Sequence, residues 1–259
     1  MDLKFMEKIY LGCPLSLGDY FVCNSLVLTW CQQATQVHIP VVPQFISTVS
    51  ALYQDHANVI ITPFLGNQIE DQYIQENQLH PINFREILQY VKIPLHGSSE
   101  IIQVPVNKGR QIYEYFDIPY SSRYLNFQLP QNIPNSLPLM HKLNPHNEPY
   151  VLLHKHTNKH VGGLPIDLSS WRPAANLPDK KIIEVELGHT ANLLDYWELI
   201  QHADEIHCVP SSFYHLVDSV ANKISAMLFY HNYRNDIVNQ INTRWNDSKW
   251  HNVEYMIKV

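Results

Sequence analysis

Apolar and polar residues along the first half of the chain follow a pattern that predicts short strands separated by helices. Residues 9–12 predict a buried strand, and residues 19–33 predict a helix in which Phe21, Val22, Leu26 and Trp30 face inward. Further strands are predicted at 37–42 and 58–62, and further helices at 44–53 and 67–74. Strands joined by helical stretches are typical of βαβ units around a parallel sheet. We therefore expect an α/β fold.

The second half repeats this organisation after a proline-rich stretch. Strands are predicted at 150–154, 181–185 and 206–209, with one helix over 193–203 and another after Ser211. Four prolines between residues 128 and 148 indicate an interdomain linker. The expected organisation is an N-terminal α/β half (1–128) on the acceptor side, a linker (129–148), a C-terminal α/β half (149–235), and a helical segment (236–259) that packs back. We expect two Rossmann-like halves that face a cleft.

Composition narrows the class of protein. The chain has 259 residues, 45% of them hydrophobic, which is enough for one large or two small cores. A formal charge of -6 and the lack of a basic patch argue against a nucleic-acid partner. No apolar run approaches the length of a transmembrane helix or signal peptide, so we expect a cytoplasmic protein. The four cysteines lack CxxC spacing, which favours reduced thiols over disulfides or zinc ligands.

Two hydroxyl side chains, Ser211 and Ser212, follow the predicted strand at 206–209 and begin a helix. The first turn of a helix presents free backbone N–H groups, and open α/β sheets bind ligands at the carboxyl ends of their strands. This position suits a phosphate group. The alternative interpretation is that the serines only cap the helix.

Other candidate residues lie after neighbouring predicted strands. Lys155, in a run with His154, His156 and His160, is our candidate for neutralising a leaving diphosphate. The histidines also suggest a metal site, but the polar turn among them disfavours it, and we expect no metal. Glu186 and His189 lie where a loop would contact the nucleoside of a donor.

Arg123 lies among aromatic residues near the predicted linker. Stacking and hydrogen bonding would let it line an acceptor site. It can equally be an arginine whose aliphatic stem packs at a protein edge. Both interpretations stay open from the sequence.

The two-half layout, the Gly18-Asp19 pair at the head of the first helix and the run Pro210-Ser211-Ser212-Phe213-Tyr214-His215 resemble one known family. They are similar to nucleotide-sugar glycosyltransferases of the GT-B type, in particular the heptosyltransferase-like branch. In that branch the late turn reads Asp-Ser-Gly-x-x-His, and this chain carries Pro210 and Ser212 in place of Asp and Gly. The resemblance covers residues 12–27 and 195–219, and is only architectural elsewhere.

This resemblance implies roles for three positions. Asp19 would be the general base that takes the acceptor's proton, although capping of the helix is the competing interpretation. The donor's diphosphate would lie at the Ser211-Ser212 turn, with His215 near enough to donate a hydrogen bond. A single carboxylate base implies an inverting reaction. No metal and no cofactor would be needed, since the nucleotide-diphosphate sugar is a co-substrate.

Motifs of other enzyme classes do not occur in the sequence. There is no GxSxG, GxxxxGK[ST], HExxH or GxGxxG, and no Asp-x-Asp pair of the kind that binds a divalent ion in the other large glycosyltransferase architecture. We expect a glycosyltransferase of polysaccharide biosynthesis, with a nucleotide-sugar donor and a saccharide acceptor as partners. The alternatives are a non-catalytic sugar-nucleotide or glycan-binding relative and a structural subunit of a polysaccharide assembly complex.

Overall fold

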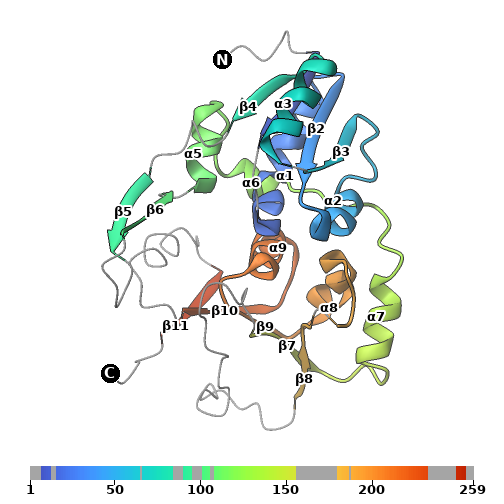
Figure 1. Cartoon of the computed structure of the whole chain (residues 1–259). Helices are drawn as coiled ribbons and strands as arrows, with labels where there is room; N and C mark the ends of the chain where they lie inside the picture. The colour runs from blue at the N-terminus through green and yellow to red at the C-terminus, as the bar shows by residue number, and fades with distance from the viewer. Residues whose placement is uncertain are drawn as a thin grey trace. The chain divides into compact units, whose positions relative to one another are not determined.

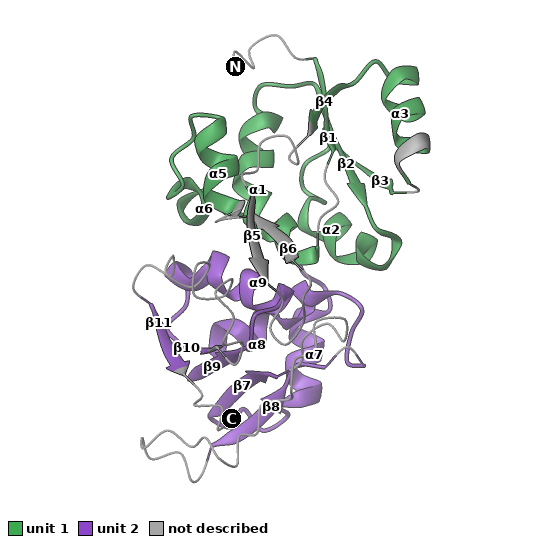
Figure 2. Cartoon of the chain, turned by 60° about the vertical axis from the view of Figure 1, so that its left-hand side comes forward, with its two compact units in different colours: residues 1–132 green, residues 133–259 purple. Residues whose placement is uncertain are grey.

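The computed structural model describes residues 7–12, 16–64, 66–83, 90–94, 101–105, 108–155, 180–186, 188–232 and 249–254 (Figure 1). The chain divides into two compact units, Met1–Asn132 and Ile133–Val259 (Figure 2). The boundary between the units falls inside the stretch 129–148, where the prolines indicated a linker.

Unit 1 contains a four-stranded parallel sheet in the order β3-β2-β1-β4. The strands are β1 (Lys8–Gly12), β2 (Gln36–Val41), β3 (Val59–Pro63) and β4 (His80–Asn83). The segments between them form α1 (Leu17–Cys31), a 3-10 turn η2 (Pro43–Phe45), α2 (Ile46–Leu52) and α3 (Asn67–Glu76). The predicted alternation of strands and helices is therefore present, with β4 as a strand that the sequence pattern did not reveal.

Helix α1 forms the centre of the core of unit 1. Twelve of its 15 residues are buried, including Phe21, Leu26 and Trp30. A helix that is apolar around most of its circumference has to be covered on several sides. Tyr20 donates a hydrogen bond to the carbonyl of Pro40 on β2, and Tyr113 donates one to the carbonyl of Val22. These bonds anchor α1 to the sheet on one side and to a later helix on the other.

The later part of unit 1 differs from a simple βαβ series. An antiparallel pair, β5 (Tyr90–Pro94) and β6 (Ile101–Pro105), precedes helices α5 (Lys108–Tyr115) and α6 (Ser122–Leu125). Both of these helices contact α1. Gly109 on α5 lies so close to its neighbours that an added Cβ would come within 3.0 Å of the Val22 side chain. A residue without a side chain therefore sets the approach of α5 to α1.

Unit 2 contains a five-stranded sheet in the order β11-β10-β9-β7-β8, in which every neighbouring pair is parallel. The strands are β7 (Tyr150–His154), β8 (Lys181–Glu184), β9 (Glu205–Cys208), β10 (Met227–Asn232) and β11 (Trp250–Glu254). The helices are α7 (Ser136–Leu143), α8 (Trp197–His202) and α9 (Ser212–Val220), with 3-10 turns η4 (Leu193–Tyr196) and η5 (Ala221–Lys223). Both units are thus α/β structures with mostly parallel sheets, as the sequence predicts.

The core of unit 2 lies between the sheet and its helices. All four residues of β9 are buried, as expected for a strand with two parallel neighbours. Helix α9 buries Phe213, Leu216, Val217 and Val220. Its Asp218 accepts a hydrogen bond from the Trp250 indole at 3.0 Å, which fastens β11 to the helix.

Two segments differ from the sequence expectation. The stretch expected as a linker contains α7, which contacts η4 and α8 and belongs to unit 2. Residues 250–254, expected as part of a C-terminal helix, form strand β11 beside β10. Residues 236–248 of that expected helix lie outside the described residues. Within the described part of the chain, no helix has the length and apolar character needed to cross a membrane.

Candidate functional site

The strand order of the unit 2 sheet reverses between β7 and β9, and the carboxyl ends of these two strands lie at the same edge of the sheet. The chain runs from β7 to β8 on one side and then places β9 on the other side of β7. His154, the last residue of β7, pairs in register with Cys208 at the end of β9. Loops that leave two such strands in opposite directions open a crevice for ligands in α/β folds. The predicted donor-binding residues follow β7, β8 and β9 at this edge.

Ser211 and His154 contact each other at this edge. Ser211 is the N-cap of α9, and its Oγ accepts a hydrogen bond from the Tyr214 N–H at 3.1 Å. The same Oγ lies 3.2 Å from His154 Nδ1. The His154 ring stacks on Phe213 with a centroid distance of 5.3 Å. The capping role of Ser211 is therefore present in the structure, and His154 is held beside it in a fixed orientation.

Ser212 and His215 occupy the first turns of α9. Ser212 is the first helical residue, and the His215 backbone N–H donates to the Ser211 carbonyl at 3.2 Å. The His215 ring lies 5.1 Å from the Tyr214 ring. Both side chains are half-buried. The structure thus brings Ser211, Ser212 and His215 together at one helix start, and their contact with a phosphate remains a prediction.

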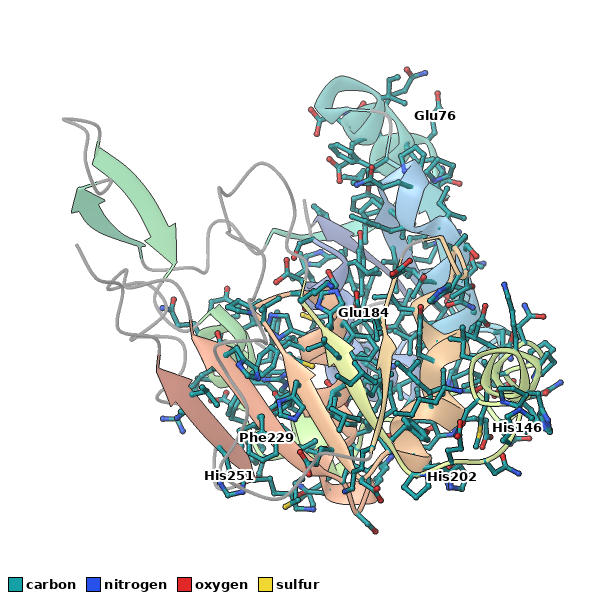
Figure 3. The ribbon with its side chains drawn as sticks, turned by 90° about the horizontal axis from the view of Figure 1, so that it is seen from below. Glu76, His146, Glu184, His202, Phe229 and His251 are labelled. Atoms are coloured by element: carbon teal, nitrogen blue, oxygen red, sulfur yellow. The ribbon has the colours of Figure 1, made fainter. Side chains whose placement is uncertain are left out.

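Lys155 pairs with a carboxylate on the neighbouring strand. Its Nζ lies 2.7 Å from Glu184 Oε1 and 2.6 Å from Glu184 Oε2. Glu184, the last residue of β8, is labelled in Figure 3. Because Glu184 balances the charge of Lys155, a diphosphate would have to compete with this ion pair for the ammonium group.

Glu186 and His189 meet at the hydroxyl of Tyr196, in the loop that follows β8. His189 Nδ1 lies 2.9 Å from Tyr196 Oη, and that hydroxyl also bonds both backbone groups of Glu186 at 3.0 Å. Tyr196 is 1% exposed, and burial raises its pKa to about 12. The sequence identified Glu186 and His189 but missed Tyr196, since a tyrosine in a helical pattern resembles an ordinary core residue.

A compact polar turn follows this loop and was also missed. The Leu194 N–H donates to Asn192 Oδ1 at 3.0 Å, and the Asn192 N–H donates to Thr190 Oγ1 at 3.1 Å. The Thr190 hydroxyl also donates to the carboxylate of Asp195. The run Thr-Ala-Asn-Leu-Leu-Asp does carry the signal of such a turn, because Thr and Asn side chains bond nearby backbone groups.

The predicted base, Asp19, lies at the start of α1 in unit 1. Its Oδ2 accepts hydrogen bonds from the Ser16 N–H and the Ser16 hydroxyl, both at 3.0 Å. A carboxylate at the third position of a helix that bonds back to the N-cap is a standard capping interaction. The capping interpretation therefore holds for Asp19, while its part in proton transfer stays a prediction.

Arg123, the predicted acceptor residue, lies on α6 in unit 1 and is 5% exposed. Its NH1 group donates to Tyr120 Oη at 2.7 Å, and its guanidinium lies 5.0 Å from the centre of the Tyr124 ring. The burial of Arg123 favours the packing interpretation, in which its guanidinium packs against Tyr120 and Tyr124. Contact between Arg123 and an acceptor stays a prediction.

Among the described residues, no group of three or more His, Cys, Asp or Glu side chains has a geometry that would hold a metal ion. His156 and His160 lie outside those residues. Cys31 and Cys208 are not in disulfides with any cysteine that the structure describes. Burial raises the pKa of the Cys31 thiol to about 11 and that of Cys208 also above its ordinary value.

The fold is similar to that of known glycosyltransferases. A crystal structure of a family 9 glycosyl transferase from Veillonella parvula DSM 2008 superposes on 98% of this chain and 87% of that chain, with a TM-score of 0.53 and 10% identity. The dodecameric iron-containing heptosyltransferase TibC, solved with ADP-D-beta-D-heptose, matches 88% of this chain and 59% of its own, with a TM-score of 0.45 and 12% identity. No family model and no curated protein matches the sequence. The likeness to the family 9 structure confirms the predicted GT-B-like α/β architecture at the level of the fold.

Proposed function

We propose that this protein is a glycosyltransferase that moves a sugar from a nucleotide-diphosphate donor to a saccharide acceptor. The observation that carries the proposal is the grouping of His154, Ser211, Glu186 and His189 at the carboxyl edge of the unit 2 sheet, where its strand order reverses. The similarity of the fold to a family 9 glycosyl transferase supports the same class.

In this proposal the donor binds to unit 2. The diphosphate lies at the start of α9, where the backbone N–H groups of Ser212 and Phe213 point along the helix axis and the helix dipole favours an anion. His215 and Lys155 approach the phosphates from either side, and Lys155 exchanges Glu184 for the ligand. Glu186 and His189 contact the nucleoside.

The acceptor binds to unit 1 in the same proposal. Asp19 takes the proton of the attacking hydroxyl, with Ser16 fixing the orientation of its carboxylate. Arg123 supports Tyr120 and Tyr124, whose rings offer a stacking surface for a sugar. One base without a nucleophilic partner implies inversion at the transferred carbon, and no metal is required.

A thermal-shift panel of ADP, GDP, UDP, CDP and dTDP, each with and without magnesium, tests donor binding. We expect one nucleotide to raise the melting temperature independently of magnesium and the Ser211→Ala, Ser212→Ala double variant to lose that shift. Leu137→Ala, at a residue of α7 that is 52% exposed, is a control from the same unit that alters neither α9 nor the loop after β8. The absence of any shift at millimolar nucleotide would refute the donor site.

A second candidate is a relative that binds sugar nucleotides without catalysis. Two observations favour it, since Asp19 already serves as a helix cap and Lys155 already has an ion-pair partner. Release of nucleoside diphosphate in the presence of donor and acceptor separates the two. Turnover that Asp19→Asn abolishes, with donor affinity unchanged, supports the enzyme, whereas binding without turnover supports the non-catalytic relative.

A further inference from the structure

The loop after β8 contains a small hydrogen-bond network whose protons can be assigned. Tyr196 Oη accepts the Glu186 N–H at 3.0 Å and donates to the Glu186 carbonyl at 3.0 Å. His189 Nδ1 lies 2.9 Å from the same oxygen. Because burial raises the Tyr196 pKa to about 12, the phenol keeps its single hydrogen at neutral pH.

This single hydrogen determines the tautomer of His189. If the phenol donated to His189, Tyr196 Oη and the Glu186 carbonyl oxygen would lie 3.0 Å apart with no hydrogen between them. Two oxygen lone pairs at that distance repel each other, so the hydrogen belongs on the side of the carbonyl. His189 must then donate through Nδ1–H, and its Nε2 carries a lone pair when the ring is neutral.

The lone pair of Nε2 lies next to a carboxylate. Nε2 is 3.9 Å from Glu186 Oε2, and the side chains of His189 and Glu186 are 22% and 51% exposed. A Cβ added to Gly188, which lies between them in sequence, would meet no atom within 4 Å. The loop thus presents two hydrogen-bond acceptors side by side, within reach of a ligand.

We infer that Glu186 and His189 form an acceptor pair that selects a ligand with two adjacent hydrogen-bond donors, and that Tyr196 is the positioning residue that keeps His189 an acceptor. This inference rests on the proposed function, in which the ligand is a nucleotide. A nucleotide offers two adjacent donors at the N1–H and 2-amino edge of guanine or at the cis-diol of ribose. Uracil and thymine offer one N–H between two carbonyl oxygens, which an acceptor pair repels.

Titration calorimetry of the full chain with GDP, IDP, UDP and 2′-deoxy-GDP tests the inference and separates the two sources. If guanine supplies the donors, IDP and UDP bind about tenfold more weakly than GDP, and 2′-deoxy-GDP binds like GDP. If ribose supplies them, only 2′-deoxy-GDP weakens. Equal affinity for all four overturns the acceptor pair but leaves nucleotide binding intact. Binding of none also overturns the acceptor pair, and the melting panel with five nucleoside diphosphates then decides the proposed function separately.

A pair of variants tests whether the Glu186 carboxylate is one of the two acceptors that bind the nucleotide. Glu186→Gln replaces one acceptor by a donor and is expected to weaken the preferred nucleotide about tenfold or more, because a hydrogen bond to a charged group is lost. Glu198→Gln is the matched control, since Glu198 forms a comparable pair with His202, Oε2 to Nε2 at 3.3 Å, in the same unit. An equal effect of both variants on affinity contradicts the assignment.

The role of Tyr196 has a spectroscopic readout. A long-range ¹H–¹⁵N NMR spectrum at slightly alkaline pH is expected to show His189 protonated at Nδ1 in the wild type and a mixture of tautomers in Tyr196→Phe. The same variant is expected to bind the preferred nucleotide several-fold more weakly. Tyr115→Phe, at a tyrosine of unit 1 that is 51% exposed, should change neither. A wild-type His189 protonated at Nε2 would overturn the inference.

Discussion

Two buried histidines on the unit 2 sheet are expected to make the free energy of unfolding depend on acid pH. His207 and His231 are 0% exposed, with His207 Nδ1 2.9 Å from His231 Nε2. His207 also stacks on Phe229, at a centroid distance of 4.5 Å, and its Nε2 lies 3.3 Å from Glu205 Oε2. Burial lowers the pKa of His207 to about 3 and that of His231 to about 4.

The sign and size of the effect follow from proton linkage. Below the unfolded pKa of about 6.5, the unfolded chain binds protons at both positions while the folded protein does not, so stability falls as pH falls. Between pH 8 and pH 5 each histidine contributes a loss of about 2 kcal/mol. Burial raises the pKa of Glu205 above its ordinary value of 4.5, so the folded protein binds this proton first and the carboxyl opposes the trend from that raised pKa down to about pH 4.5. Because Glu205 is present in both proteins, the wild type and the variant are compared with each other at each pH.

Urea unfolding at pH 8, 6 and 5, followed by tryptophan fluorescence, measures this dependence. His207→Gln is expected to be less stable at pH 8, because it loses the stacking on Phe229, but to lose about 2 kcal/mol less than the wild type on going to pH 5. His251→Gln is the control, because His251 is exposed on β11, the strand beside β10. Figure 3 labels His251 and Phe229. Parallel pH curves for wild type and His207→Gln would refute the reasoning.

Three further changes test the packing of the structure by thermal or urea unfolding. Trp250→Phe removes the donor to the buried Asp218 carboxylate and should lower the free energy of unfolding by about 1–3 kcal/mol. A smaller loss would contradict a net stabilising role for this hydrogen bond. Leu199→Ala, at a residue that is 0% exposed, should lower the free energy of unfolding by about 2–5 kcal/mol. Leu125→Ala, at a residue that is 73% exposed, is the control and should change it by no more than about 0.5 kcal/mol. Similar losses for both variants would be inconsistent with the burial of Leu199. Ser211→Ala without ligand should cost about 1 kcal/mol through loss of the cap, and an unchanged melting temperature would argue against it.

The sequence could predict the elements whose apolar spacing is regular. Helix α1 and strands β1 and β7 are rich in apolar residues, and the structure contains them within two residues of the predicted bounds. Pro40 in β2 does not interrupt the sheet, because the pairing of β2 with β1 extends only to His38. Buried parallel strands of this kind leave a strong local signal.

Other elements depend on contacts that no local pattern reveals. The prolines that indicated a linker include Pro138, which lies in the first turn of α7, where a missing N–H leaves no helical bond unsatisfied. Strand β11 carries His251 and Asn252, and its position is fixed by pairing with β10 and by the bond from Trp250 to Asp218. Tertiary pairing there overrides the weak local preference.

The candidate site was predictable in the same uneven way. Ser211 was found because a hydroxyl between a strand and a helix is a sequence signal. The sequence did not reveal the partners of His154, Lys155 and His189. Phe213 and Glu184 are distant in sequence from the residues that they contact, and Tyr196 meets His189 only through the fold of the loop between them. The local sequence thus indicated which loops carry the candidate site residues, and the fold determined which of their side chains already have hydrogen-bond or ion-pair partners.

The all-parallel sheet of unit 2 has a consequence for how the chain folds. Parallel neighbours cannot be joined by a tight hairpin, so each pair has to close a long loop of chain before it gains hydrogen bonds. Strand β7 pairs with the central strand β9, although β8, η4 and α8 lie between them in sequence. Sheets built from such distant pairings fold slowly. We expect the joining of β7 to β9 to limit the refolding rate of unit 2, so that a substitution at Leu152 or Ile206, which face each other across that pair, slows refolding more than one on β11.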